Sequence, residues 1–142
     1  MRSLCCVALL AYLTSFAGAA DWANLSESDS LDGWTKVGGG ATYEIADGVI
    51  TGRTGLGKNT FLTRGPYRDF VMEFDVKCDP KLNSGVQIRS HLYAEETPQE
   101  SSPKKIREKG EMYGYQCEIR DAINGDHGCS GNFWDEGRRT MW

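Results

Sequence analysis

Two short segments in the second half of this 142-residue chain carry charged and amide side chains at alternate positions. A β-strand points successive side chains to opposite faces of its sheet, so residues two apart share a face. The residues that such a face would present are, on the first segment, Gln87, Arg89 and His91, and, on the second, Gln116, Glu118 and Arg120. Amide and guanidinium groups bind hydroxyl and carbonyl oxygens, and a carboxylate can accept a proton. The pattern therefore predicts the wall of a polar binding cleft.

A third cluster lies near the C-terminal end, where Asp135, Glu136 and Arg138 follow the short β-type run 132–134. A second carboxylic acid at a strand end could protonate a departing oxygen. The same residues also have purely structural interpretations, with no role in binding or catalysis. Glu118 and Arg89 also fit a cross-strand salt bridge, and residues 135–139 also fit a turn followed by a solvated edge.

The elements that must position these residues are short strands. The expected strands cover residues 42–45, 49–51, 59–63, 69–78, 83–91, 112–121 and 132–134. Asp47-Gly48 between two β-type runs predicts a tight hairpin turn. Residues 95–111, rich in Glu, Lys, Ser and Pro, are expected to be a long exposed loop or a weak helix. No segment predicts a long amphipathic helix, so the chain is expected to be all-β and antiparallel, a β-sandwich or jelly roll.

Residues 69–78 show the longest regular alternation in the chain, which predicts a strand with one apolar face. The side chains expected to meet in one core between two sheets are Phe70, Met72, Phe74, Val86, Ile88, Tyr115 and Ile119. Pro80 would end this strand, because proline lacks the donor that the ladder needs.

Composition excludes several functions. The net charge of −4, with no basic stripe, argues against nucleic-acid binding. No phosphate-binding glycine motif is present, and the two histidines are too few for a zinc–thiolate site at this cysteine spacing. We expect no cofactor and no metal from these motifs, with a divalent cation left open, and we make no prediction of oligomeric state.

Residues 1–19 resemble a cleaved signal peptide: Arg2, then an apolar run, then Ala17-Gly18-Ala19. The apolar run is too short for a comfortable membrane span. We therefore expect a secreted or periplasmic single domain over residues 20–142. Its three cysteines are Cys78, Cys117 and Cys129, an odd number that leaves at least one without a partner inside this segment.

Six motifs in order resemble one family, the 3-keto-disaccharide hydrolase domain. They are Leu31-Asp-Gly-Trp34, Asp47-Gly48-Val-Ile, Asp69-Phe70, Asn83-Ser-Gly-Val86 with Arg89, Tyr113-Gly-Tyr-Gln-Cys-Glu-Ile119, and Ser130-Gly with Asp135-Glu-Gly-Arg-Arg139. The resemblance covers roughly residues 31–142 and implies a concanavalin-like jelly roll, similar to lectins and β-glucanases. Cys117 stands where the family usually has an aliphatic residue. Because the sequence stops directly after a strand, we expect this chain to be a C-terminally truncated form of a longer domain.

The resemblance implies an exported enzyme that acts on a glycoside already oxidised to a ketone at sugar carbon 3. Such a ketone acidifies the hydrogen on carbon 2, so a base can remove it and expel the group on carbon 1. Glu118 is the expected base and Arg89 the group that holds the ketone or enolate. Asp135 or Glu136 would act on the leaving group. The residues expected to bind the sugar are Gln87, Gln116, Tyr113, His91 and Arg138.

Two other classes remain open from the sequence. A non-catalytic, lectin-like carbohydrate-binding module would have the same fold, since jelly rolls serve both uses. A surface adhesion domain would explain export but not the polar strand positions.

Overall fold

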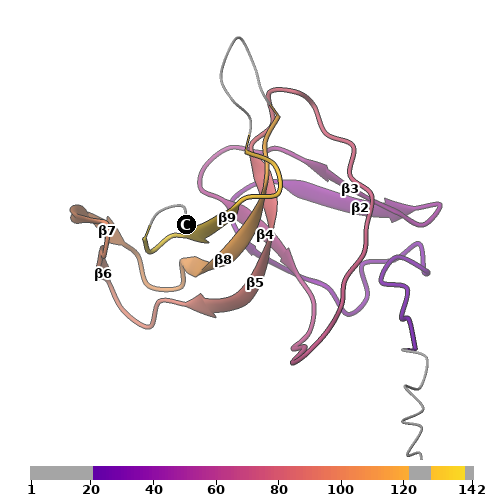
Figure 1. Cartoon of the computed structure of the whole chain (residues 1–142), viewed down its shortest axis with the longest axis horizontal. Helices are drawn as coiled ribbons and strands as arrows, with labels where there is room; N and C mark the ends of the chain where they lie inside the picture. Colours follow the sequence, from indigo (N-terminus) through magenta and orange to yellow (C-terminus); the bar gives the residue numbers. More distant parts are fainter. Residues whose placement is uncertain (1–20, 122–128, 140–142) are drawn as a thin grey trace, which may run out of the picture.

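The computed structural model describes residues 21–121 and 129–139 (Figure 1). Within these residues every regular element is a β-strand, and every strand pair is antiparallel. The strands are β1 (Thr35–Gly38), β2 (Thr42–Ala46), β3 (Val49–Arg53), β4 (Thr60–Thr63), β5 (Ser84–Leu92), β6 (Thr97–Gln99), β7 (Ser102–Arg107), β8 (Met112–Ile119) and β9 (Phe133–Glu136). This confirms the all-β antiparallel class.

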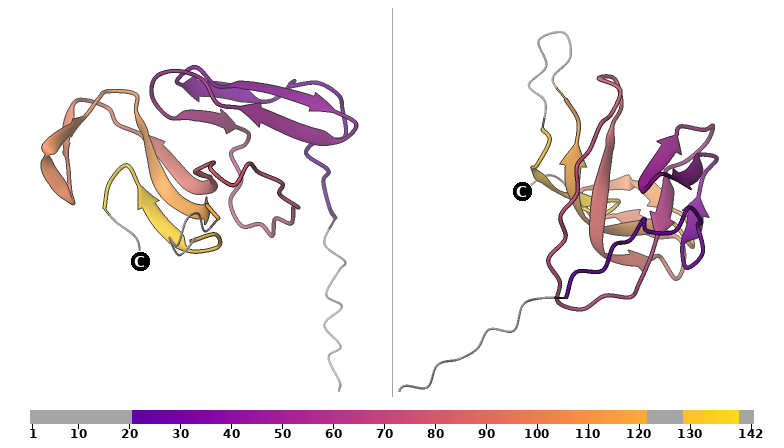
Figure 2. Two further views of the ribbon diagram at one scale, coloured as in Figure 1. Left: turned by 90° about the horizontal axis from the view of Figure 1, so that it is seen from above. Right: turned by 90° about the vertical axis from the view of Figure 1, so that its right-hand side faces the viewer.

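The first four strands form one layer, in which β1 pairs with β4 and β2 with β3 (Figure 2). The β2–β3 turn has positive φ at both central residues, 51° at Asp47 and 74° at Gly48, which is the hairpin geometry that this dipeptide favours. The Tyr43 hydroxyl donates a hydrogen bond of 3.0 Å to the Thr60 carbonyl and so ties this hairpin to β4. The predicted hairpin is confirmed.

The second layer is a three-stranded sheet in the order β5-β8-β9, with β8 in the centre (Figures 1 and 2). β8 pairs with β5 over most of its length and with β9 from Gly114 to Cys117. Its backbone groups therefore have hydrogen-bonding partners on both sides, which is the condition for a regular central strand. The predicted strands 83–91 and 112–121 are confirmed to within a few residues.

A β-bulge interrupts the pairing of β5 with β8. Ile88 pairs with Tyr115, but the next pair is His91 with Tyr113, so Arg89 and Ser90 of β5 together oppose the single residue Gly114 of β8. Arg89, at the bulge, has a positive φ of 53°. A bulge changes which face the following residues occupy. The prediction that His91 shares a face with Gln87 is therefore wrong, and its ring stacks on Tyr113 at 5.6 Å.

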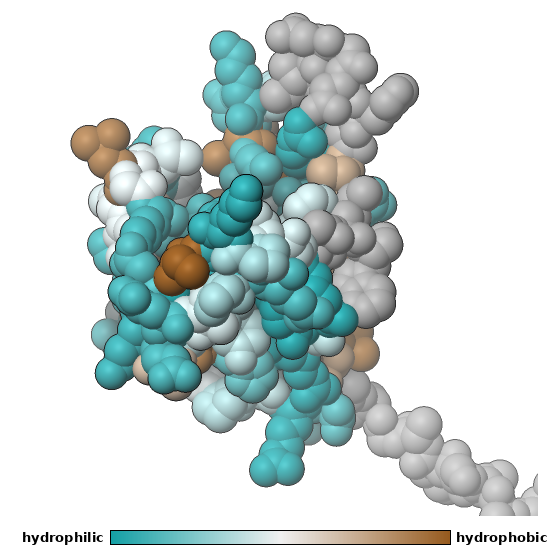
Figure 3. All heavy atoms as spheres, turned by 90° about the vertical axis from the view of Figure 1, so that its left-hand side faces the viewer, coloured by the Kyte–Doolittle hydropathy of each residue, from teal (hydrophilic) through white to brown (hydrophobic). Residues whose placement is uncertain are grey.

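Residues 95–111 were expected to be a loop or weak helix, and this prediction is wrong. They contain the hairpin β6–β7, with Pro98 facing Ile106 in the pairing. The outer surface of this part of the molecule is mostly hydrophilic, with a few separated apolar groups (Figure 3). On its inner side Arg107 is buried, and its guanidinium donates two hydrogen bonds, of 2.9 and 3.1 Å, to Gln99 Oε1. The charged composition of residues 95–111 predicted that their side chains lie in solvent. Arg107 is instead buried and bound by Gln99.

The segment 69–78 forms no strand, so the sequence prediction is wrong here. Its alternate apolar residues are exposed: Phe70 by 47%, Phe74 by 52% and Val76 by 57%. Among the described residues no backbone hydrogen bond joins this segment to another strand. The alternation is that of a strand, but a strand also needs a neighbour to pair with.

The core is correspondingly small. Of the described apolar side chains, only Ile45 and Met112 are buried. The expected core residues of β5 and β8, namely Val86, Ile88, Tyr115 and Ile119, are half-buried, whereas Phe70, Met72 and Phe74 are exposed. None of the seven residues expected in one core is buried, so the predicted core is not formed as expected.

Cys78, Cys117 and Cys129 are all half-buried free thiols. The described part of the chain also holds no helix with the length and apolar character needed to cross a membrane. The predicted signal peptide lies outside the described residues.

Candidate functional site

Strand register places four polar side chains on one face of the β5-β8-β9 sheet, and we call Gln87, Gln116, Glu118 and Glu136 the polar face. Gln87 pairs with Gln116, Gly85 with Glu118, and Gly114 with Glu136. Directly paired residues of antiparallel strands point to the same side, and alternate residues of β8 share a face. The sequence predicts Gln116 and Glu118 on one face of the strand and Tyr115 and Cys117 on the other. The register confirms this prediction.

Two glycines make room for the amides of this face. A Cβ on Gly85 would lie 2.5 Å from Gln116 Cγ, and one on Gly114 would lie 2.9 Å from Gln87 Nε2. Both distances are well below van der Waals contact. The Gly85 and Gly114 positions therefore allow the two glutamine side chains to lie flat along the sheet, and any larger residue would displace them.

Glu118 is the buried carboxylate of the polar face, with 6% of its surface exposed. Gln116 Nε2 donates a hydrogen bond of 2.8 Å to Glu118 Oε2. The backbone of Glu118 is fixed as well, because its N–H donates to the Asn132 carbonyl at 2.9 Å and its carbonyl accepts from the Gly131 N–H at 2.8 Å. A carboxylate held at one oxygen, with the other not engaged by Gln116, is arranged to accept a proton.

Glu136 provides a second carboxyl group on the same face. Asn59 Nδ2 donates a hydrogen bond of 3.2 Å to its Oε1. Burial raises the pKa of Glu136, the charge of Glu118 raises this pKa further, and Arg107 acts in the opposite direction. A carboxyl group with a raised pKa keeps its proton to a higher pH than usual. Glu136 is thus suited to donate a proton.

Gln87 completes the polar face. Its Nε2 donates a hydrogen bond of 3.1 Å to Ser90 Oγ, whereas its Oε1 is buried with no partner among the described groups. A buried acceptor without a donor costs free energy. A hydroxyl that reached this oxygen after a small side-chain movement would remove that cost.

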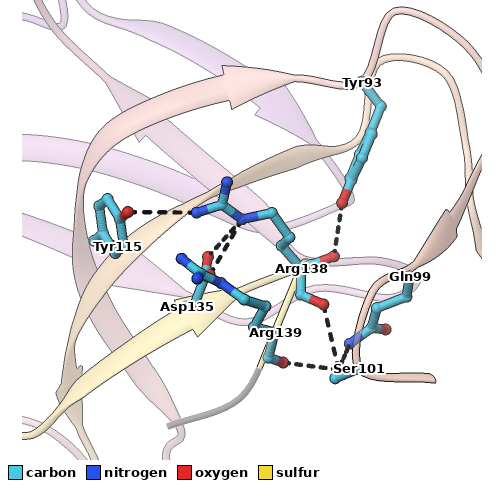
Figure 4. A network of polar contacts seen from close by, with 8 residues as sticks. Tyr93, Gln99, Ser101, Tyr115, Asp135, Arg138 and Arg139 are labelled. Carbon is cyan, nitrogen blue, oxygen red and sulfur yellow. Dashed lines mark hydrogen bonds and ion pairs between the residues drawn. The ribbon is translucent and has the colours of Figure 1, made fainter. Parts of the chain in front are cut away.

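The opposite face of the same sheet carries a charge cluster around Asp135 (Figure 4). Asp135 has no exposed surface. It accepts hydrogen bonds of 3.2 and 3.1 Å from Arg138 Nε, and Arg139 Nε also bonds to it. Two cations compensate the buried anion, which is the condition for its burial.

The guanidinium of Arg138 lies over two aromatic rings of β8. Its guanidinium carbon lies 5.7 Å from the ring centres of Tyr113 and of Tyr115, and its Nη2 is 3.5 Å from the Tyr115 hydroxyl. The hairpin β6–β7 is attached here as well, since Ser101 Oγ donates to the Arg139 carbonyl at 2.9 Å. The cluster therefore fixes the end of β9 and positions the hairpin beside the sheet (Figure 4).

The residues predicted from sequence are thus divided between two faces. Gln87, Gln116, Glu118 and Glu136 lie together on the polar face. The predicted residues on the opposite face are Asp135, Arg138, Tyr113 and His91.

Arg89 is separate from the polar face carboxylates. Its Nη2 lies 3.5 Å from Asp69 Oδ1, and both side chains are more than half exposed. The cross-strand partner of Glu118 is Gly85, four residues before Arg89, which is about 13 Å along a strand. The alternative of a cross-strand salt bridge between Arg89 and Glu118 is therefore wrong, and the described structure does not bring this pair together.

Nothing in the sequence indicates two residues that act on Glu136. Asn59 donates a hydrogen bond to its carboxyl group, and, against the effect of burial, the charge of Arg107 lowers its pKa. Asn59 lies 77 positions from Glu136 in the chain, and no motif links them. Arg107 sits in a segment whose mixed charges are typical of solvated loops, so its burial gives no sequence signal. Within the described ranges, no group of three or more histidine, cysteine or carboxylate residues could hold a metal ion.

Comparison with known proteins gives one result. A family model described as the 3-keto-alpha-glucoside-1,2-lyase-like domain matches residues 21–141. No curated protein and no solved structure matches this chain.

Proposed function

Because the chain belongs to the 3-keto-alpha-glucoside-1,2-lyase-like domain family, we propose that it cleaves glycosides oxidised to a ketone at sugar carbon 3, by elimination followed by hydration. The observation that carries this proposal is the pair of carboxyl groups on the polar face, one buried and held by Gln116 and the other with a raised pKa. The family description gives the reaction class, and these two groups supply the acid and base that the reaction needs.

In the proposed first step Glu118 takes the proton from carbon 2. The electron pair of that C–H bond forms the carbon 1–carbon 2 double bond, through an enolate on the carbon 3 oxygen, and the carbon 1–oxygen bond breaks. Glu136 gives its proton to the departing oxygen. The enolate oxygen needs donors, and the Gln116 and Gln87 amides are the groups of the polar face that can supply them.

In the second step water adds to carbon 1 of the resulting enone. Glu136, now ionised, takes a proton from this water, and Glu118 returns its proton to carbon 2. Both carboxyl groups are then restored to their starting state. The products are a 3-keto sugar and the free alcohol, and no electron acceptor is consumed.

Asp135 has a supporting role in this proposal, although the sequence offered it as an acid equal to Glu136. Its carboxylate oxygens are engaged by the guanidinium groups of Arg138 and Arg139, so they are directed to these ion pairs rather than to a substrate. Arg89 is solvent-exposed near Asp69 and would reach a substrate only after leaving that ion pair. We further propose export, on the signal-like residues 1–19.

The test compares one disaccharide in its oxidised 3-keto form with the same disaccharide unoxidised. Elimination requires the ketone, so only the oxidised form should release its leaving group. Equal cleavage of both would contradict elimination and indicate conventional two-carboxylate glycoside hydrolysis. Binding of either sugar without any cleavage would favour the lectin-like alternative.

A further inference from the structure

The register of the β5-β8-β9 sheet decides what lies between the two carboxyl groups of the polar face. Glu136 pairs with Gly114, and Glu118 is four residues further along β8 than Gly114. Four residues of a strand span about 13 Å. Burial raises the pKa of Glu136 and the charge of Glu118 raises it further, so the second carboxyl group is felt across this stretch of the sheet. A sugar ring that contacts both groups must therefore lie over the row of residues midway between them.

This middle row consists of Gln87 on β5, Gln116 on β8 and Trp134 on β9. Gln87 pairs with Gln116, and Gln116 pairs with Trp134, so the three side chains point to the same side of the sheet. Trp134 is also two residues before Glu136 in β9, which places both on one face. The two amides can bind sugar oxygens, whereas the indole supplies a broad apolar surface.

The aromatic rings on the two faces of this sheet differ in how they are engaged. On the opposite face, Tyr93 and Tyr113 lie against each other with 4.5 Å between ring centres, and Arg138 lies over Tyr113. The Trp134 side chain is half-buried, and it makes no hydrogen bond, ring contact or cation–π contact with any described residue. Its ring therefore remains available to a ligand that lies on the middle row.

Resting on the function proposed above, we propose that Trp134 is a substrate-binding residue whose indole ring stacks against the C–H face of the 3-keto sugar ring. A pyranose ring carries C–H groups on its faces and its oxygen atoms around its rim. Contact of one face with the indole buries apolar surface of both rings and leaves the rim oxygens to the amides of Gln87 and Gln116. Trp134 thus positions the ring between Glu118 and Glu136 and takes no part in proton transfer.

The experiment measures binding of the 3-keto disaccharide to the full chain carrying Glu118→Gln, which prevents turnover, by isothermal titration calorimetry. Adding Trp134→Leu removes the flat ring and should raise the Kd about tenfold or more. Adding Trp134→Phe keeps an aromatic ring and should raise the Kd by no more than about threefold. The matched control is Trp22→Phe, at a position 62% exposed before the first strand, which should leave the Kd unchanged.

A kinetic readout in the chain with Glu118 intact separates substrate binding from a structural role. Stacking acts equally on the ground state and the transition state, so Trp134→Leu should raise KM about tenfold and change kcat by no more than about threefold. A lower unfolding midpoint with unchanged Kd and KM would mean that Trp134 only packs within the fold, and would overturn the inference. Equal Kd values for the Leu and Phe variants would overturn it as well.

The outcomes distinguish this inference from the function on which it rests. A Kd that Trp134→Leu leaves unchanged, in a chain that cleaves the 3-keto disaccharide, overturns the inference and leaves the proposed reaction standing. Binding that depends on Trp134, in a chain that cleaves nothing, supports the stacking site and contradicts the proposed reaction. A chain that binds no sugar before Trp134 is changed overturns both.

Discussion

Strand β8 and the segment 69–78 have the same alternating pattern but opposite outcomes. β8 lies in the centre of its sheet, and its buried side chains include the charged Glu118. The segment 69–78 lies outside the sheets, and its apolar alternate residues are the exposed ones. Here a carboxylate is inside and phenylalanine is outside.

The difference shows what alternation does and does not determine. Alternation decides which residues share a face, whereas burial depends on what covers that face. β8 has β5 and β9 as hydrogen-bonding neighbours, and Asn132 and Gly131 also bond to its last residues. The segment 69–78 has no such neighbour among the described residues.

The largest expected effect is on catalysis at β8. Glu118→Gln keeps the shape and the hydrogen bond to Gln116 but cannot accept a proton. We expect a loss of about 10²–10⁴-fold in kcat on a 3-keto-glucoside. The control is Glu100→Gln at the exposed β6–β7 turn, which should retain activity. Retained activity in Glu118→Gln, with product confirmed, would remove the proposed base from the mechanism.

The next effect concerns burial in the two regions. Met112→Ala deletes a buried side chain of β8 and should lower the free energy of unfolding by about 2–5 kcal/mol. Phe74→Ala deletes a larger side chain from an exposed position and should change it by no more than about 0.5 kcal/mol. Urea unfolding measures both. Equal losses would mean that the segment 69–78 is packed rather than exposed.

A smaller effect is expected from crowding the polar face. In Gly114→Ala the new methyl group would meet Gln87 Nε2 at 2.9 Å and the Ile88 carbonyl oxygen at 3.0 Å. The Gln87 side chain and the bulge must then move, at a cost of about 1–3 kcal/mol in the free energy of unfolding. The measurement is urea unfolding against the unmodified chain. An unchanged midpoint would show that Gln87 does not lie over Gly114.

The smallest effect is a pH dependence from Glu136. Its pKa is raised in the folded protein, chiefly by burial, so the folded state binds this proton more tightly than the unfolded state. Stability from this group is therefore full below the unfolded pKa and falls as the pH rises to the folded pKa. Glu136→Gln should remove this decline, whereas Glu44→Gln at an exposed site should not. Unfolding midpoints between pH 4 and pH 7 measure it, and parallel curves for all three proteins would contradict the raised pKa.

Much of the candidate site could be predicted from local pattern. The position of Gln116 and Glu118 on one face of β8 follows from period-two alternation alone. The β2–β3 hairpin follows from Asp47-Gly48, because few residues other than asparagine, aspartate and glycine adopt positive φ at low cost. These features depend only on neighbours in the chain, so the amino-acid sequence by itself determined them.

Tertiary structure alone decided the rest, because the contacts involved join distant parts of the chain. The bulge at Arg89 moved His91 to the other face, and Asn59 met Glu136 across 77 positions. Arg107 became buried because Gln99 and Glu111 both bind its guanidinium. The segment 69–78 stayed unpaired although its pattern is that of a strand, because a strand forms only where another strand satisfies its backbone hydrogen bonds.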